Sequence, residues 1–366
     1  MRSGDYELAI SKCIQKLQHK DNDEAAIVLE AAYDKAYYRD INEIAFLKKE
    51  GNPSNNMKVY QLYQSIRSRY NQVQPLLPLH IKSKNRDAIF NNVADEDLIV
   101  SKNQAAEYLY AKSLQLIANK NRFDARQANF NLVQVKTLFG NYKNADQLIE
   151  ETSISGKTLI LYNVINLGIN SLPSNLYSNL NSLSLYNLNS QWQEFRLPSA
   201  DTLTKFHYKL ILNVNNVIVS PDNIAENKYT ETKQVEDGWE YVLDAHGNVA
   251  KDSLGNDIKK PKFKTITAFV SEVSQMKVAT IQCNLNLIDL STGNLVFSLP
   301  VQNTNTFEHH YAVANGDLKA LTDASKEKIK VPPLPFPNEL DLLMGCSEQI
   351  KPLIYNLISQ NKGYIL

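Results

Sequence analysis

The chain has 366 residues, of which 43% are hydrophobic and 21% are charged, a balance typical of folded globular domains rather than disordered chains. Its 39 lysine and arginine residues equal its 39 aspartate and glutamate residues, so it lacks the basic surplus that attracts a phosphate backbone. Nucleic acid is therefore not an expected partner. At roughly 150 residues per domain, this length predicts two domains.

The three cysteines, Cys13, Cys283 and Cys346, lie far apart in the sequence and form no CxxC pair. Their spacing indicates neither a zinc site nor a disulfide framework. Cys13 shares a predicted helical face with Ala9 and Leu17, and we expect it to be a buried thiol. No apolar stretch reaches the roughly 18 to 20 residues that a membrane-spanning helix needs. We expect no cofactor and no tightly bound metal.

The chain opens with residues typical of a turn between two helices, yet no helix precedes them. Gly4, Asp5, Tyr6 and Ala9 carry this pattern. We therefore expect a missing N-terminal segment, which could hold an export signal with a lipid-anchor cysteine.

Residues 5 to 155 carry apolar side chains at the spacing of amphipathic helices. Two helices are expected before Gly51 and Pro53, which are residue types that commonly follow a helix end, and a third continues to Pro75. After a connection at residues 79 to 95, the helical spacing resumes. The first domain, residues 1 to 155, is therefore predicted to be an all-α array.

Two turns in this array share one pattern, in which Gly or Asn is followed by an aromatic residue and then by alanine. The two copies are Asn121, Phe123 and Ala125, and Gly140, Tyr142 and Ala145. The first residue allows the chain to reverse, the aromatic side chain fills the gap between two helices, and the alanine lets them approach closely. This pattern resembles the tetratricopeptide repeat over roughly residues 1 to 155. The spacing departs from that family's period of about 34 residues, so the resemblance implies a degenerate array.

Residues 157 to 366 are predicted to form a mixed, strand-rich α/β domain, because the apolar spacing changes after Gly156. A strand is expected from Thr158, followed by a crossover helix over residues 172 to 188 with Pro173 in its first turn. Further strands are expected at residues 208 to 219, 265 to 273 and 278 to 288. The last of these enters a β-hairpin that returns at residues 295 to 301, and a proline strap at residues 332 to 337 precedes a C-terminal helix.

A β-hairpin insertion is predicted at residues 227 to 262, with two similar turns. The turns contain Asp244, Gly247 and Asn248, and Asp252, Gly255 and Asn256. Their carboxylate and amide oxygens could suit calcium, but their spacing does not match an EF-hand loop, and β-turns require the same residue types. We therefore interpret them as turns. Trp239 and Tyr241 flank the turns, and this insertion makes them our candidate partner-binding residues.

His309 and His310, next to Glu308, form the only histidine cluster in the sequence. A metal or acid/base site would need a third group that the sequence does not identify. Adjacent residues at a strand end face opposite sides of a sheet, so a structural role is the simpler interpretation. A metal-dependent or hydrolytic enzyme centred on these histidines remains the alternative hypothesis.

The strand, the crossover helix and the hairpin from Leu285 to Leu295 resemble the α/β domain of curli-secretion-type envelope lipoproteins. With the repeat-like first half, the whole chain resembles uncharacterised outer-membrane lipoproteins of Bacteroidetes-type bacteria. The resemblance implies an α+β protein that acts as a protein-binding scaffold or assembly factor on the periplasmic side of the outer membrane. Its expected partners are other envelope proteins, and its expected membrane contact is the missing lipid anchor. Without such a signal, a cytoplasmic adaptor is expected.

Overall fold

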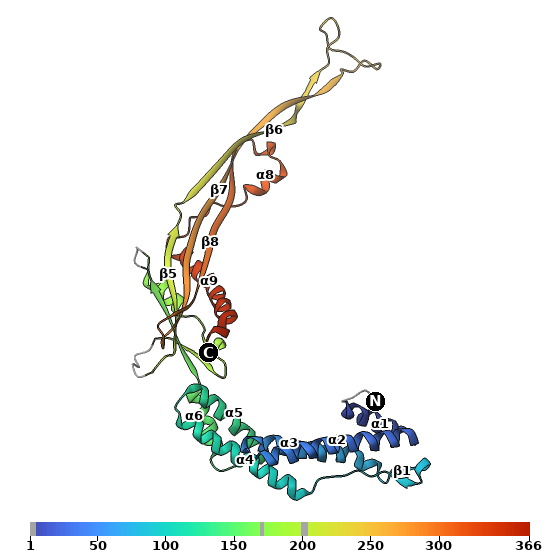
Figure 1. Ribbon diagram of the computed structural model, residues 1–366. Coiled ribbons are helices and arrows are strands. Elements are labelled where there is room, and N and C mark those ends of the chain that lie inside the picture. Colours follow the sequence, from blue (N-terminus) through green and yellow to red (C-terminus); the bar gives the residue numbers. More distant parts are fainter. Residues whose placement is uncertain (1–4, 169–171, 199–203) are drawn as a thin grey trace. The chain divides into compact units, whose positions relative to one another are not determined.

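The computed structural model describes residues 5–168, 172–198 and 204–366 (Figure 1). It divides the chain into two compact units, Met1–Lys157 and Thr158–Leu366. The first unit is helical and the second is built around a β-sheet, which confirms the predicted α+β fold class.

Unit 1 is a series of helices in which each helix packs against the next one in the chain. The helices are α1 (Tyr6–His19), α2 (Asp23–Glu50), α3 (Asn56–Val73), α4 (Asp95–Ala118), α5 (Arg122–Phe139) and α6 (Ala145–Ser155). Between α3 and α4, the short strands β1 (His80–Ile81) and β2 (Arg86–Asp87) form an antiparallel pair.

Three helices of unit 1 begin where a side chain satisfies a terminal backbone group, and α2 also ends at a glycine. The side chains of Asp5, Asn22 and Asn121 each accept a hydrogen bond from a backbone N–H in the first turn of α1, α2 and α5, respectively. Helix α2 ends at Gly51, whose φ of 64° lies in the left-handed region that favours glycine. The turn predicted at Gly4 lies outside the described residues.

The two predicted inter-helix turns differ in how they use their aromatic residue. Ala125 and Ala145 are buried, as the close approach of helices requires. Tyr142 is half-buried and packs near Phe139, with ring centroids 5.5 Å apart. Phe123, however, is 46% exposed, so the expectation that it fills the gap between two helices is wrong. The guanidinium groups of two neighbouring arginines, Arg122 and Arg126, lie 4.5 and 5.1 Å from its ring centroid, and these cation–π contacts take the place of burial.

A buried ion cluster connects the first three helices of unit 1. Arg69 of α3 donates from Nη2 to Glu7 of α1 at 2.7 Å and to Asp40 of α2 at 2.8 Å. The side chains of Arg69 and Asp40 are each only 2% exposed. Arg39 donates to the other oxygen of Asp40 at 2.8 Å. Because a buried charge without a partner is costly, Arg69 and Asp40 depend on each other, whereas Glu7 and Arg39 lie at the exposed rim of the cluster.

Unit 2 contains a six-stranded mixed sheet with the strand order β4-β3-β5-β7-β6, in which β8 also pairs with β7. Strand β3 is parallel to β4 and β5, and the remaining pairs are antiparallel. The strands are β3 (Thr158–Asn166), β4 (Gln193–Arg196), β5 (Tyr208–Val219), β6 (Asn223–Tyr241), β7 (Lys259–Asp289) and β8 (Leu295–Gly316).

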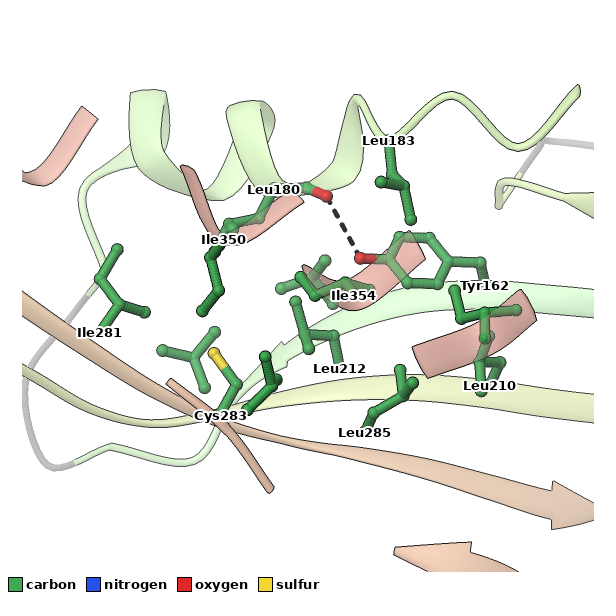
Figure 2. Packing of buried hydrophobic residues seen from close by; sticks show 14 of the residues in the cluster. Tyr162, Leu180, Leu183, Leu210, Leu212, Ile281, Cys283, Leu285, Ile350 and Ile354 are labelled. Carbon is green, nitrogen blue, oxygen red and sulfur yellow. Dashed lines mark hydrogen bonds between the residues drawn. The ribbon is translucent and has the colours of Figure 1, made fainter. Parts of the chain in front are cut away.

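The main core of unit 2 lies between one face of this sheet and the helices α7 (Ser174–Asn181) and α9 (Glu339–Asn361). Figure 2 shows leucine and isoleucine side chains of both layers closing around Tyr162, whose hydroxyl donates to the backbone oxygen of Leu180 at 3.3 Å. Cys283 lies in this core, and burial raises the pKa of its thiol to about 12. The expected burial of Cys13 is confirmed.

The predicted crossover helix over residues 172 to 188 is too long. Helix α7 covers only Ser174–Asn181, and Pro173 precedes it at the cap position rather than in its first turn. Leu183 and Leu185 are buried but not helical. Leucines at short intervals can pack into the core from an irregular segment as well as from a helix. Their spacing therefore did not mark the end of the helix.

The two strands predicted at residues 265 to 273 and 278 to 288 are one continuous strand, β7. Its buried face changes along its length, because Ile266, Ala268 and Val270 are buried in the first half, whereas the odd-numbered residues from 275 to 287 are buried in the second. Successive side chains of a strand point to opposite faces, so different layers cover the two halves. The hairpin predicted after β7 is confirmed, with a glycine at Gly293 of φ 73° in its turn.

The predicted insertion at residues 227 to 262 is not separate from the sheet. Strand β6 begins at Asn223 and pairs with β7 from Met276 out to Lys259. Strand β8 pairs with β7 only as far as Ala268, so β6 and β7 continue beyond it as a two-stranded ribbon (Figure 1).

The predicted C-terminal helix is present as α9.

The short helix α8 (Asp323–Lys328) is held against the first half of β7 by two glutamates. Glu231 of β6 accepts hydrogen bonds from the backbone N–H of Thr322 at 2.6 Å and from the hydroxyl of Ser325 at 2.7 Å. Glu272 of β7 accepts from the ammonium group of Lys328 at 2.6 Å. These bonds lower the pKa of both carboxyl groups, because they stabilise the charged form.

We predict that Asp40→Asn lowers the free energy of unfolding of unit 1 by about 3 kcal/mol, because it leaves the buried charge of Arg69 with one partner fewer. Chemical denaturation followed by circular dichroism measures this loss. The control is Asp146→Asn, which removes an exposed ion pair with Lys136 and should cost less than about 1 kcal/mol. Equal effects of the two substitutions would contradict the prediction.

We also predict that α8 loses protection from hydrogen exchange at acidic pH. The folded-state pKa values of Glu231 and Glu272 are lowered, so their stabilising bonds are fully present above the ordinary carboxyl pKa and are lost as the pH falls through the folded-state values. Protection factors, which correct for the intrinsic pH dependence of exchange, are the measurement. At neutral pH, Glu231→Gln should reproduce the loss of protection in α8. The control, Glu236→Gln, should not. Protection of α8 that does not change with pH would refute the prediction.

Candidate functional site

A surface groove of about 940 Å³ runs along α3 and the first half of α4 in unit 1. One face of α3 lines it with uncharged amide and hydroxyl side chains that recur every three or four residues. These side chains are Gln61, Gln64, Ser65, Ser68, Asn71 and Gln72, and all are exposed. From α4, Leu98 and the exposed Ile99 add apolar surface.

The charged side chains that line this groove are already engaged within unit 1. Glu7 accepts from Arg69, and Arg67 forms an ion pair with Asp95 at 2.5 Å. The ammonium group of Lys102 lies 4.5 Å from the ring centroid of Phe139. The groove therefore offers hydrogen-bond donors, acceptors and apolar surface rather than free charge. Such a lining suits the backbone and uncharged side chains of a polypeptide.

Trp239 and Tyr241, the candidate partner-binding residues, lie together on one face of the β6–β7 ribbon. A β-bulge at Gly238, with φ 82°, brings Trp239 opposite Pro261 and Tyr241 opposite Lys259. The two rings meet edge to face, with centroids 4.8 Å apart, and are 50% and 42% exposed. The ammonium group of Lys259 lies 3.5 Å from the centroid of the Trp239 ring. The structure thus supplies a cation that the sequence analysis did not assign to this pair.

The two turns beyond this pair use their aspartates to hold their own backbone. Asp244 accepts from the backbone N–H groups of His246 and Asn248, at 2.8 and 2.9 Å. Asp252 makes the same bonds to Leu254 and Asn256, at 2.8 and 2.9 Å. This geometry supports the interpretation of these residues as turn residues rather than as calcium ligands.

His309 and His310 lie inside β8, which continues to Gly316, and not at a strand end as expected. His309 stacks between Phe307 and Tyr311, and its Nε2–H donates to the backbone oxygen of Pro332 at 2.9 Å. This bond fastens the proline strap to the sheet. His309 therefore has a structural role in the strap.

His310 points to the opposite face of β8, where its Nε2 lies 2.9 Å from Oε1 of Glu308. The two histidines are thus not brought together, because neighbouring side chains of a strand alternate between faces. Within residues 5–168, 172–198 and 204–366, no three His, Cys, Asp or Glu side chains gather in a way that could hold a metal ion.

No protein-family model matches the chain, and no curated protein sequence matches it. The resemblances to tetratricopeptide repeats and to curli-secretion-type lipoproteins therefore stay predictions. Among the helices in the described parts of the chain, none is both long and apolar enough to cross a membrane.

The groove was missed in the sequence analysis, although its signal was available. Polar residues recur at positions 61, 64, 65, 68, 71 and 72, which places them on one face of a helix. Only the apolar face of the same helix entered the prediction of this segment. A continuous uncharged polar face is unusual in a chain with this many charged residues, and it would have indicated the surface.

We predict that His309→Phe, which keeps the stacking but removes the bond to Pro332, lowers the free energy of unfolding of unit 2 by about 1 kcal/mol. Hydrogen exchange across residues 329 to 338 should increase in the same variant. His246→Phe serves as the control and should change neither quantity, because His246 is exposed in the first turn of the β6–β7 ribbon and, among the described residues, only its backbone N–H is hydrogen-bonded there. Unchanged stability and unchanged hydrogen exchange of the strap in His309→Phe would show that the bond to Pro332 is dispensable.

Proposed function

We propose that the protein is a protein-binding scaffold or assembly factor that holds a segment of a partner polypeptide in the groove between α3 and α4. The row of uncharged amide and hydroxyl side chains that α3 contributes to this groove is the observation that carries the proposal. Amide side chains both donate and accept hydrogen bonds, so they can pair with the N–H and C=O groups of an extended peptide. Leu98 and Ile99 supply surface for an apolar side chain of the partner.

The cell envelope is the proposed location of this activity. The support is the resemblance to outer-membrane lipoproteins, and a lipid-anchor signal in a preceding segment would hold the protein at the periplasmic side of the membrane. Envelope proteins are the proposed partners.

The alternative, a metal-dependent or hydrolytic enzyme centred near His309 and His310, has less support. Acid/base or metal chemistry needs side chains that converge on one point. His309 is bonded to the strap, and His310 faces away from it.

The groove can be tested with the full chain and a phage-displayed library of random linear peptides. We predict that selected peptides bind the unmodified protein and that the double variant Gln61→Ala, Gln72→Ala weakens their binding about thirtyfold, because each of the two lost hydrogen bonds contributes about 1 kcal/mol. Fluorescence polarisation measures the affinity. Raising the salt concentration should change this affinity only modestly, because Glu7, Arg67 and Arg69 at the groove are already held in ion pairs.

A matched double variant, Gln15→Ala with Gln147→Ala, provides the control. Both glutamines are exposed and lie on α1 and α6, and neither lines the groove. Peptides that bind all three proteins equally, or whose binding depends on Trp239, would show that the groove is not the binding site.

A further inference from the structure

The far end of the β6–β7 ribbon carries large apolar side chains that no core of unit 2 uses. Leu254, at the apex of the second turn, is 86% exposed, and Leu243 is 60% exposed. Ile258, Trp239 and Tyr241 are also exposed. None of these five residues belongs to a hydrophobic cluster among the described residues. Folding therefore does not account for their apolar character, which points to burial against something outside the chain.

The acidic groups of this ribbon end are each held by a local partner. Asp244 and Asp252 bind backbone N–H groups of their own turns. Glu240 pairs with Lys260 at 3.0 Å, and Asp257 pairs with Lys251 at 3.1 Å. The ammonium group of Lys259 instead lies over the Trp239 ring, so a cation and an amphipathic aromatic side chain stand together.

We propose that this ribbon end, defined by Trp239, Tyr241, Leu243, Leu254, Ile258 and Lys259, binds the surface of a phospholipid bilayer. Trp and Tyr favour the headgroup level of a bilayer, and a lysine beside them can reach lipid phosphate. The apolar residues are spread over the end of β6, a turn apex and the segments that join β6 to β7 rather than gathered in one flat patch. A fluid bilayer can surround such a tip, whereas a protein partner would need a pocket of matching shape.

This surface is separate from the α3–α4 groove and does not rest on its function. Lipid contact at the ribbon end would place unit 2 at a membrane without a membrane-spanning helix. The two proposals can therefore fail independently, because vesicles probe the ribbon end and peptides probe the groove.

Trp239 itself can report the contact, because the chain has only two tryptophans. In a Trp192→Phe background, emission is measured as the full chain is titrated with phosphatidylcholine vesicles, with and without phosphatidylglycerol. We expect a blue shift and quenching by brominated lipid in both compositions. We expect the double variant Leu243→Asp, Leu254→Asp to need at least about tenfold more lipid for the same shift, because it removes two apolar side chains from the contact.

Phe269→Asp is the control. Phe269 is also a large apolar residue and is 60% exposed, but it lies on strand β7 away from the ribbon end. It should keep the full response. Circular dichroism should show that every variant is folded, as expected for exposed positions. An unshifted Trp239 in all vesicles, or a shift that survives both aspartates, would overturn the proposal. A Trp239 response to the selected peptides in place of vesicles would assign the ribbon end to a protein partner and would also refute lipid binding.

Discussion

Strand β7 supplies the hydrogen-bonding partners for three other strands, and the arrangement of unit 2 depends on this pairing. Its first half pairs with β6 as far as Met276, and its second half pairs with β5 from Ala279. Strand β8 runs along its other edge from Ile288 to Ala268. One uninterrupted backbone thus belongs both to a wide sheet, which can carry helices, and to a narrow ribbon.

The two faces of β7 are covered at different places, which explains the position of α8, the strap and α9. In the first half, Ala320 and Leu321 pack on Ile266, Ala268 and Val270. In the second half, α9 packs on the opposite face. The chain between α8 and α9 must therefore pass from one face to the other, and it does so through the strap that His309 holds at Pro332. Of the two histidines, His309 takes part in this change of face.

Sequence reasoning succeeded where a local signal decides the structure. Gly51 ends α2 and Gly293 shapes the hairpin turn because both need a positive φ, and this requirement is visible in the residue type. Strand β5 was also recognised, although a bulge between Val214 and Asn216 shifts its alternation. There the apolar residues on either side of the bulge still face one core.

Sequence reasoning failed where the outcome depends on layers that are distant in the chain. The change of buried face in β7 looked like the end of one strand and the start of another, because the alternation breaks near residues 271 to 274. Nothing local marks which face α8 or α9 will cover. The cation beside Trp239 was missed for the same reason, since only the register of β6 on β7 brings Lys259 to that ring.

The two proposed surfaces differ in the kind of interaction through which each would bind a partner. In the groove, Glu7, Arg67 and Arg69 are engaged in ion pairs within unit 1, and Lys102 lies over the ring of Phe139. Its recognition must therefore come from hydrogen bonds, which depend on geometry and favour a defined polypeptide. At the ribbon end, no core lies beneath the apolar residues, and their attraction is not directional. A partner there needs to offer an apolar environment but no particular shape, and a bilayer meets that condition better than a folded protein does.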